Sequence, residues 1–179
     1  GDGGGIYFYT NGTDTLNNVI VSGNSASEDG GGILTSGTNT SIISNVNLIG
    51  NSSKNGGGMF LNGIKKISNM LIVNNSTWGI GGSSGYGGGA NIYTPGANPI
   101  IDSTLFVNNS GSSNGGGLYH WGGSPTLNFV TIAGNSGVKG GGMYNSSSAT
   151  LNNVSIFNNQ GSKSGDGIAT GDYASTGGV

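Results

Sequence analysis

The sequence predicts an all-β fold: a single-domain, right-handed, three-sided parallel β-helix of six to seven coils that spans residues 1–179. Two motifs predict it, because each recurs along almost the whole chain and the two keep in register. Repeats of 25–31 residues with short alternating segments and no helical pattern are typical of a β-solenoid. The right-handed sense is expected from the general preference of parallel crossover connections.

The first motif is a triple glycine followed by a hydrophobic or small residue. Its copies, of which the last is a degenerate Gly-Asp-Gly, start near residues 3, 30, 56, 87, 115, 140 and 165. Glycine permits a positive φ and a close approach of two backbones, which a tight corner between parallel strands requires. We therefore expect a corner at each triplet and a short strand directly after it, as in segment 5–8.

The second motif is an apolar residue, two residues, a second apolar residue, one residue, a third apolar residue, two residues and an asparagine. Leu16, Val19, Val21 and Asn24 form the first of six copies, in which only Thr104 breaks the apolar pattern. Val19 and Val21 are two apart and share a strand face, whereas the odd step from Leu16 to Val19 predicts a corner. The motif therefore supplies two further strands of each coil. Stacked coils should align its apolar residues into buried columns.

The asparagine that ends each copy is expected to lie at the next corner. Asparagines stacked in this way can bond their side-chain amides to one another and to the turn backbone. The sequence thus predicts a structural ladder rather than a ligand site. Its members are Asn24, Asn51, Asn75, Asn109, Asn135 and Asn159.

The composition narrows the classes of protein to consider. Forty glycines and 7% charged residues resemble a low-complexity tract, but the periodic apolar positions favour a folded chain. No cysteine is present, which excludes disulfides and cysteine metal sites. The net charge of −2 and the lack of arginine argue against nucleic acid as a partner. No apolar run approaches the roughly 20 residues of a membrane span. Because the chain starts at Gly1 without Met or a signal peptide, we expect a processed chain or a fragment.

The acidic residues are spread over different positions of the repeat, which argues against catalysis. They are Asp2, Asp14, Glu28, Asp29, Asp102, Asp166 and Asp172. Glycosidases need clustered carboxylates, and only Asp2, Glu28 and Asp29 are expected to lie together, near the start of the rod. The single histidine, His120, is expected in a surface turn beside Trp121. We predict no enzyme, no catalytic residue, no metal and no cofactor.

The repeat resembles that of a known group of proteins. Gly31-Gly32-Ile33 and Phe106-Val107-Asn108-Asn109 are similar to the repeats of chlamydial polymorphic outer-membrane proteins and of secreted right-handed parallel β-helix repeat proteins. The resemblance covers residues 3–168. It implies an extracellular or cell-surface protein with a structural or adhesive function. Polysaccharide lyases and hydrolases share the fold more distantly, so a carbohydrate-binding or carbohydrate-degrading β-helix is the alternative.

Two sets of side chains are expected to point outward. The first, called the outer stripe, is aromatic and could stack on sugar rings, pack on another protomer or be covered by loops: Tyr7, Phe60, Tyr119 and Tyr144. The second, called the apolar patch, needs a cover, either the insertion Ser76–Tyr86 or another subunit: Ile49, Leu71, Val73, Leu105 and Val107. Among the Asn-x-Ser/Thr sequons, Asn11 and Asn145 are the predicted glycosylation sites because they are expected in loops.

The two ends of the rod leave open parallel edges, which invite pairing with another chain. Copies could stack head to tail into a filament, since such a contact does not close. The sequence thus favours an extracellular structural or adhesive solenoid that assembles end to end into a surface filament or matrix fibre. A fragment of a longer adhesin passenger is a further alternative. Glycans are a possible partner; nucleic acid and a membrane span are not expected.

Overall fold

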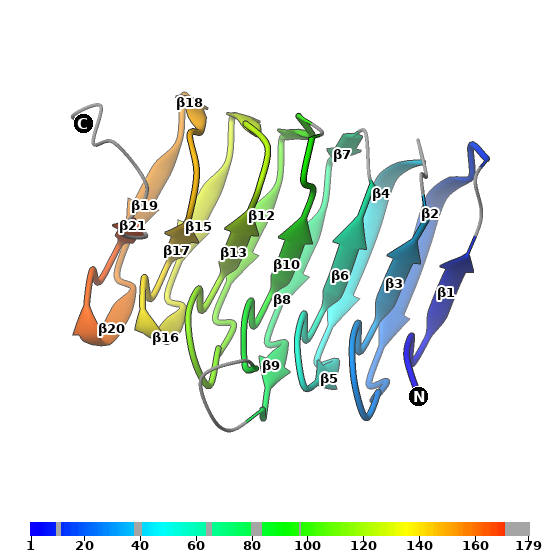
Figure 1. Ribbon diagram of the computed structural model, residues 1–179, viewed down its shortest axis with the longest axis horizontal. Coiled ribbons are helices and arrows are strands. Elements are labelled where there is room, and N and C mark those ends of the chain that lie inside the picture. Colours follow the sequence, from blue (N-terminus) through cyan, green and yellow to red (C-terminus); the bar gives the residue numbers. More distant parts are fainter. Residues whose placement is uncertain (10–11, 38–40, 64–65, 80–83, 97, 171–179) are drawn as a thin grey trace.

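The chain forms a parallel β-solenoid of about six turns, and residues 1–9, 12–37, 41–63, 66–79, 84–96 and 98–170 are described by the computed structural model. Its coils stack along one axis, with β1 (Ile6–Tyr9) and β21 (Ile168–Thr170) at opposite ends (Figure 1). The described ranges contain strands but no helix, so no helix there could cross a membrane. The predicted all-β parallel solenoid is confirmed.

The strand after each glycine triplet joins a seven-stranded parallel sheet, called sheet A. The register runs in step, with Ile6 opposite Ile33 and Ile33 opposite Met59. Each coil therefore adds one strand to sheet A, and the strands pair through equivalent positions of the repeat. The strands are β1 (Ile6–Tyr9), β3 (Ile33–Ser36), β6 (Met59–Asn62), β10 (Ala90–Tyr93), β13 (Leu118–Trp121), β17 (Met143–Asn145) and β21 (Ile168–Thr170).

The second motif forms a ten-stranded parallel sheet, called sheet B. In the first two coils one strand runs through the whole motif, and from the third coil onward the motif splits into two strands. The strands are β2 (Thr15–Ser22), β4 (Ile42–Ile49), β7 (Lys66–Ser68), β8 (Leu71–Val73), β11 (Ile100–Asp102), β12 (Leu105–Val107), β14 (Thr126–Asn128), β15 (Thr131–Ala133), β18 (Thr150–Asn152) and β19 (Ser155–Phe157).

The third side of the solenoid begins directly after the asparagine ladder. The sequence predicts only a corner at this place. Two short strand pairs lie there, and isolated bridges between serines of successive coils connect them. Ser52 Oγ donates to Ser25 Oγ (3.3 Å), and Ser136 Oγ to Ser110 Oγ (3.2 Å). The strands are β5 (Ser52–Ser53), β9 (Ser76–Thr77), β16 (Ser136–Lys139) and β20 (Gln160–Ser164).

The odd apolar step in the second motif is explained by one left-handed residue per coil. Asn18 has a φ of 57° and turns the chain between Leu16 and Val19, so that both side chains face inward. Asparagine adopts this conformation more readily than other non-glycine residues. The predicted corner is confirmed, although sheet B bends through it in the first two coils instead of ending. The equivalent residues, all with φ between 47° and 57°, are Asn45, Asn69, Ser103, Phe129 and Asn153.

The columns of inward side chains form the core, as predicted. Ile43, Leu48, Ile72 and Phe106 are fully buried in sheet B, and sheet A supplies facing aliphatic residues. Thr104, the exception in the apolar pattern, is also fully buried, and its hydroxyl donates to the carbonyl of Asp102 (2.8 Å). This hydrogen bond gives the buried hydroxyl group of Thr104 a partner inside the apolar column.

The asparagine ladder is confirmed. Asn51 donates from its backbone N–H (2.9 Å) and its Nδ2 (3.0 Å) to Oδ1 of Asn75 in the next coil. Its Nδ2 also donates to the carbonyl of Val21 in the preceding coil (2.9 Å). Asn75, Asn109 and Asn135 repeat this pattern. Each buried amide thus ties three successive coils together.

His120 does not lie in a surface turn. It belongs to β13, faces inward and is fully buried, because the alternation of the strand sends Tyr119 and Trp121 outward instead. Its Nδ1 contacts Asn145 Oδ1 (2.7 Å) in the following coil. Nε2 has no hydrogen-bond partner among the described residues. Burial lowers the pKa of His120, and the contact with Asn145 opposes this only in part.

We expect this histidine to make the solenoid sensitive to mild acid. Its pKa is lower in the folded chain than the ordinary value of 6.5, so just below pH 6.5 the unfolded chain binds more protons than the folded one. The free energy of unfolding should therefore have its full value above pH 6.5 and decrease as the pH falls below it. Urea unfolding between pH 7.5 and 5.5 measures the slope. His120→Gln should flatten it, and an unchanged slope in that variant would assign the acid sensitivity to other groups.

Candidate functional site

The outward face of sheet A carries the largest group of aromatic side chains in the described chain. The outer stripe lies where the sequence predicted it, one residue after the first inward residue of each strand. Tyr119 and Tyr144 stack with ring centroids 5.3 Å apart and an interplanar angle of 7°. Between Phe60 and Tyr119 the stripe is interrupted by Asn91, which is buried. The stripe therefore has two separate halves.

The half at coils five and six is partly covered by the insertion. Tyr86, at its end, stacks on Tyr119 with centroids 4.6 Å apart. Burial raises the pKa of Tyr119 to about 12, with smaller contributions from Tyr86 and Tyr144, so its hydroxyl stays protonated as a donor. The insertion thus covers the outer stripe in part, and Ile80 of the same insertion lies outside the described residues.

A second aromatic column lies beside the outer stripe and was not recognised in the sequence. Tyr93 and Trp121 stack nearly parallel, with centroids 4.8 Å apart and an interplanar angle of 5°, and they are 37% and 41% exposed. The alternation of the strand could have predicted this column, because Tyr93 and Trp121 each come two residues after a position of the outer stripe and so lie on the same face of sheet A. Trp121 was instead placed in a loop. It ends β13, because that strand is one residue longer than the expected segment.

A hollow of about 260 Å³ opens on this face over coils one to four, and we call it the sheet A hollow. Tyr7, Phe60 and Tyr93 line it with aromatic surface. Ser36 and Asn62 line it as well with short side chains, and Asn62 lies opposite Tyr93 in the strand register. Trp121 covers one ring face of Tyr93 from coil five, so the opposite ring face points toward the hollow.

Carboxylates line the edge of the hollow nearest the glycine corner. Asp2 and Asp29 are the two acids there, and Asn55 Nδ2 donates to Asp29 Oδ1 (3.0 Å). Glu28 forms an ion pair with Lys54 (2.8 Å), and the hydrogen bond and charge of Lys54 lower the pKa of Glu28. Burial raises the pKa of Asp29, and the nearby charges of Asp2 and Glu28 add to the effect. Of the three acids expected to cluster, Asp2 and Asp29 line the hollow together, whereas Glu28 is paired with Lys54 instead.

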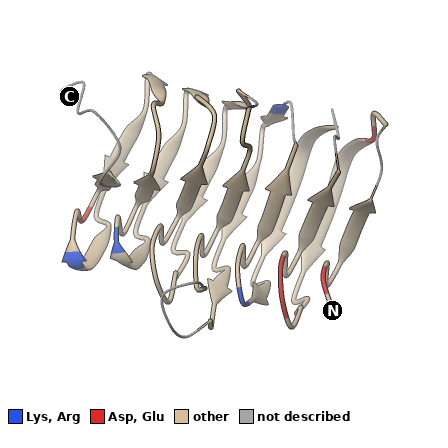
Figure 2. Ribbon diagram, viewed as in Figure 1, with Lys and Arg blue, Asp and Glu red and all other residues tan. Residues whose placement is uncertain are grey.

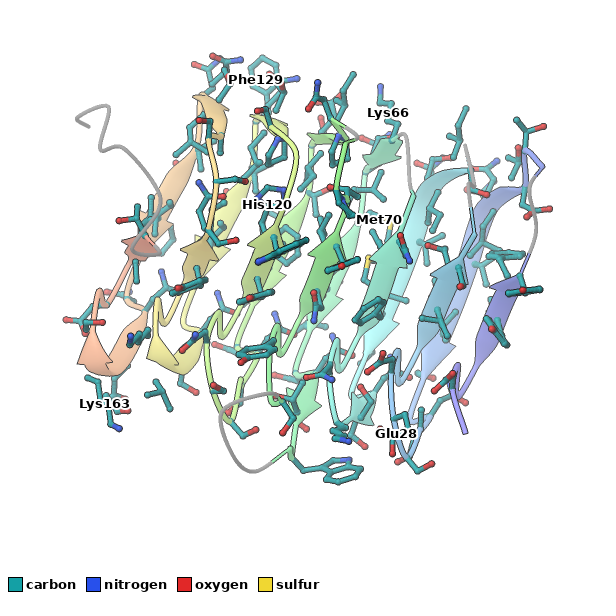
Figure 3. The ribbon with its side chains drawn as sticks, viewed as in Figure 1. Glu28, Lys66, Met70, His120, Phe129 and Lys163 are labelled. Carbon is teal, nitrogen blue, oxygen red and sulfur yellow. The ribbon has the colours of Figure 1, made fainter. Side chains whose placement is uncertain are left out.

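The other charged residues lie mainly along the upper and lower edges of the solenoid in the view of Figure 2. Figure 3 shows this for Glu28, Lys66 and Lys163, whereas Met70 lies between the sheets. Lys66 pairs with Asp102 on the outside of sheet B (3.4 Å). Among the described residues no three acidic, histidine or cysteine side chains gather at a place that could hold a metal ion.

The apolar patch forms a continuous surface on sheet B. Ile49 lies opposite Val73, and Val73 opposite Val107 in the next coil. Leu105, opposite Leu71, is 42% exposed, and the other four members of the patch are partly exposed. The insertion was one expected cover. Where the structure describes it, however, it leads to Tyr119 on sheet A.

The two predicted glycosylation sites differ in outcome. Asn11 lies outside the described residues. Asn145 was expected in a loop, but it ends β17 with only 7% of its surface exposed, so the expectation of an accessible acceptor there is wrong. Its Oδ1 contacts His120 and its Nδ2 donates to the Ser147 carbonyl, which hold the amide inside the coil.

Comparison with protein-family models, with curated proteins and with solved structures gives no match for this chain. The parallel solenoid and the buried asparagine stack therefore rest on the structure itself. The resemblance to polymorphic outer-membrane proteins stays an expectation from the repeat.

Proposed function

We propose that this chain is an extracellular structural and adhesive β-solenoid that binds glycans in the sheet A hollow. One observation carries the proposal: Tyr93, which stacks on Trp121 and is 37% exposed, lines a hollow that also has polar side chains at its edge. Sugar rings combine an apolar face of C–H groups with hydroxyls around the rim. Such rings stack on aromatic side chains and hydrogen-bond to carboxylates and amides.

The remainder of the fold suits a rigid support for this site. Every coil is tied to its neighbours by the ladder and by parallel strands, which keeps outward residues at a spacing of roughly 4.8 Å. Ser36, Asn62 and Asp29 provide acceptors and donors for sugar hydroxyls at fixed positions. The site needs neither a catalytic residue nor a cofactor, and the proposed role is binding without turnover.

Replacing Tyr93 with alanine should weaken binding of a neutral oligosaccharide about three- to tenfold, because an aromatic contact contributes about 0.5–1.5 kcal/mol. Calorimetric titration against a panel of neutral oligosaccharides measures the dissociation constant. Phe157→Ala is the control, since Phe157 is exposed on sheet B, away from the hollow. Equal losses in the two variants, or a wild-type chain that binds none of the panel, would contradict the proposal.

End-to-end assembly is a second candidate, and the direction of the hydrogen bonds favours it. At the glycine corner the N–H groups of one coil donate to carbonyls of the next, as from Gly31 to Gly56 (3.2 Å) and from Gly116 to Gly140 (3.1 Å). The ladder runs in the same direction. One edge of the described stack therefore presents acceptors there and the other presents donors, so that two copies are complementary head to tail.

Asp166 works against this assembly in the register of the other coils. It occupies the middle position of the seventh triplet, where a Cβ on the equivalent Gly57 or Gly116 would lie 2.5 Å or 2.3 Å from the next coil's carbonyl oxygen. A coil stacked on the seventh would thus have to shift. The Asp166 carboxylate accepts from Gly161 N–H (3.0 Å), a contact within its own chain.

We expect fibres with an axial repeat of about 30–35 Å at high protein concentration, and longer fibres for Asp166→Gly. Negative-stain electron microscopy over a concentration series measures fibre length. Asp14→Asn, which removes a charge outside the glycine corner, should not change it. Isolated rods at every concentration for both the wild type and Asp166→Gly would rule out end-to-end stacking.

A further inference from the structure

Within the described part of the chain, neither carboxylate at the sheet A hollow forms an ion pair. Asp2 and Asp29 line the hollow, and no lysine is among the described residues that line it. The ammonium group of Lys54 acts on Asp29, but it is paired with Glu28 (2.8 Å). Asp29 keeps a single amide contact, from Asn55. A ligand in the hollow could therefore pair its own positive charge with Asp2 and Asp29.

The energetics of Asp29 point in the same direction. Burial, Asp2 and Glu28 all raise the pKa of Asp29, and the contact with Asn55 and the charge of Lys54 compensate only in part. A positive charge placed between Asp2 and Asp29 would relieve this mutual repulsion. A negative charge placed there would add to it.

The size and the remaining walls restrict the occupant further. A volume of about 260 Å³ is below the range of roughly 300–1,000 Å³ typical of pockets for drug-sized ligands, which suits one or two sugar rings. The open face of Tyr93 gives one ring a stacking surface. Ser36 and Asn62 lie within the same hollow as partners for hydroxyls.

From this juxtaposition we infer that the sheet A hollow is selective for hexosamine units with a free, protonated amino group, whose ammonium lies between Asp2 and Asp29 while the ring stacks on Tyr93. The inference rests on the proposed glycan-binding function and specifies its substrate class. N-acetylated units, which lack the charge, bind more weakly, and uronic acids are repelled.

Calorimetric titration of the whole chain with a glucosamine tetramer, an N-acetylglucosamine tetramer and a tetragalacturonate, at pH 6 and low salt, tests the inference. We expect the glucosamine tetramer to bind about fivefold or more tightly than its N-acetylated counterpart, because partly exposed ion pairs contribute up to about 1 kcal/mol each. Added salt should reduce the preference. The tetragalacturonate should not bind.

Asp29→Asn and Asp2→Asn should each lower the preference for the free amine about threefold, through weaker binding of the glucosamine tetramer. Asp2 is exposed, so its variant is available if Asp29→Asn fails to fold. Asp14→Asn, outside the hollow, should keep the preference. Equal binding of both tetramers, or a preference that survives both substitutions, overturns the inference and leaves the proposed function standing. Binding of neither tetramer overturns the inference, and the neutral panel then decides separately whether the proposed function fails too.

Discussion

Gly88→Ala is expected to lower the free energy of unfolding by about 3 kcal/mol or more, the upper range for overpacking a closed site. A Cβ at Gly88 would lie 2.4 Å from the Ser110 carbonyl carbon and 2.5 Å from the Gly116 carbonyl oxygen. Both obstacles are backbone, one across the coil and one in the next coil, so no side-chain rotation relieves them. The loss should lower the melting temperature by about 6–12 °C in a chain of this length.

Gly50→Asn is the matched control for the glycine corner. Gly50 has a φ of 62°, and nothing lies within 4 Å of a Cβ built there. The repeat itself uses asparagine at the equivalent positions Asn74 and Asn108, with φ of 55° and 52°. Thermal unfolding followed by circular dichroism should show a large loss for Gly88→Ala and almost none for Gly50→Asn. Similar losses for the two would contradict the assignment of the Gly88→Ala effect to close packing.

Asn109→Ala is expected to cost about 3 kcal/mol. The substitution removes the acceptor of the Asn75 N–H (2.9 Å) and of Asn75 Nδ2 (3.0 Å), and the donor to the Ile72 carbonyl (2.9 Å). Buried polar groups that lose their partner cost about 1–3 kcal/mol each. Urea unfolding monitored by circular dichroism gives the change directly.

Asn152→Ala controls for the loss of an amide contact as such. Asn152 Nδ2 also donates to an asparagine of the neighbouring coil, Asn128 (2.9 Å), but on the exposed side of sheet B. Water replaces that contact, so the change should stay within about 0.5 kcal/mol. If Asn109→Ala were as mild as Asn152→Ala, the buried ladder would contribute no more to stability than a surface contact.

The stability of the coil stack and the proposed site are connected through spacing. The ladder and the glycine corner hold successive coils in register, and the 4.8 Å separation of the Tyr93 and Trp121 rings matches the distance expected between neighbouring strands. A substitution that loosens the stack near coils four and five should therefore also disturb the open ring face at the hollow. Asn109 belongs to coil four, which makes its variants informative for both properties.

Part of the candidate site could be predicted from the sequence. Period-two alternation placed Tyr7, Phe60, Tyr119 and Tyr144 outward, and the structure agrees in every case where it pairs neighbouring strands. The same rule applied two residues further along would have identified Tyr93 and Trp121. They were missed because the strand was expected to end earlier, and strand ends are not marked by the alternation itself.

The sequence by itself determined the coil: the glycine corner, the inward columns, the asparagine ladder and the outward direction of the stripe follow from residue type and spacing within one repeat. Only the tertiary structure decided the shape of the surface, that is, where it is hollowed. The sheet A hollow brings together the short side chains of Ser36 and Asn62, the rings of Tyr7 and Tyr93, and Asp29 from a glycine corner. Periodicity fixes the face on which a side chain lies, whereas depth and shape depend on which side chains from different coils become neighbours.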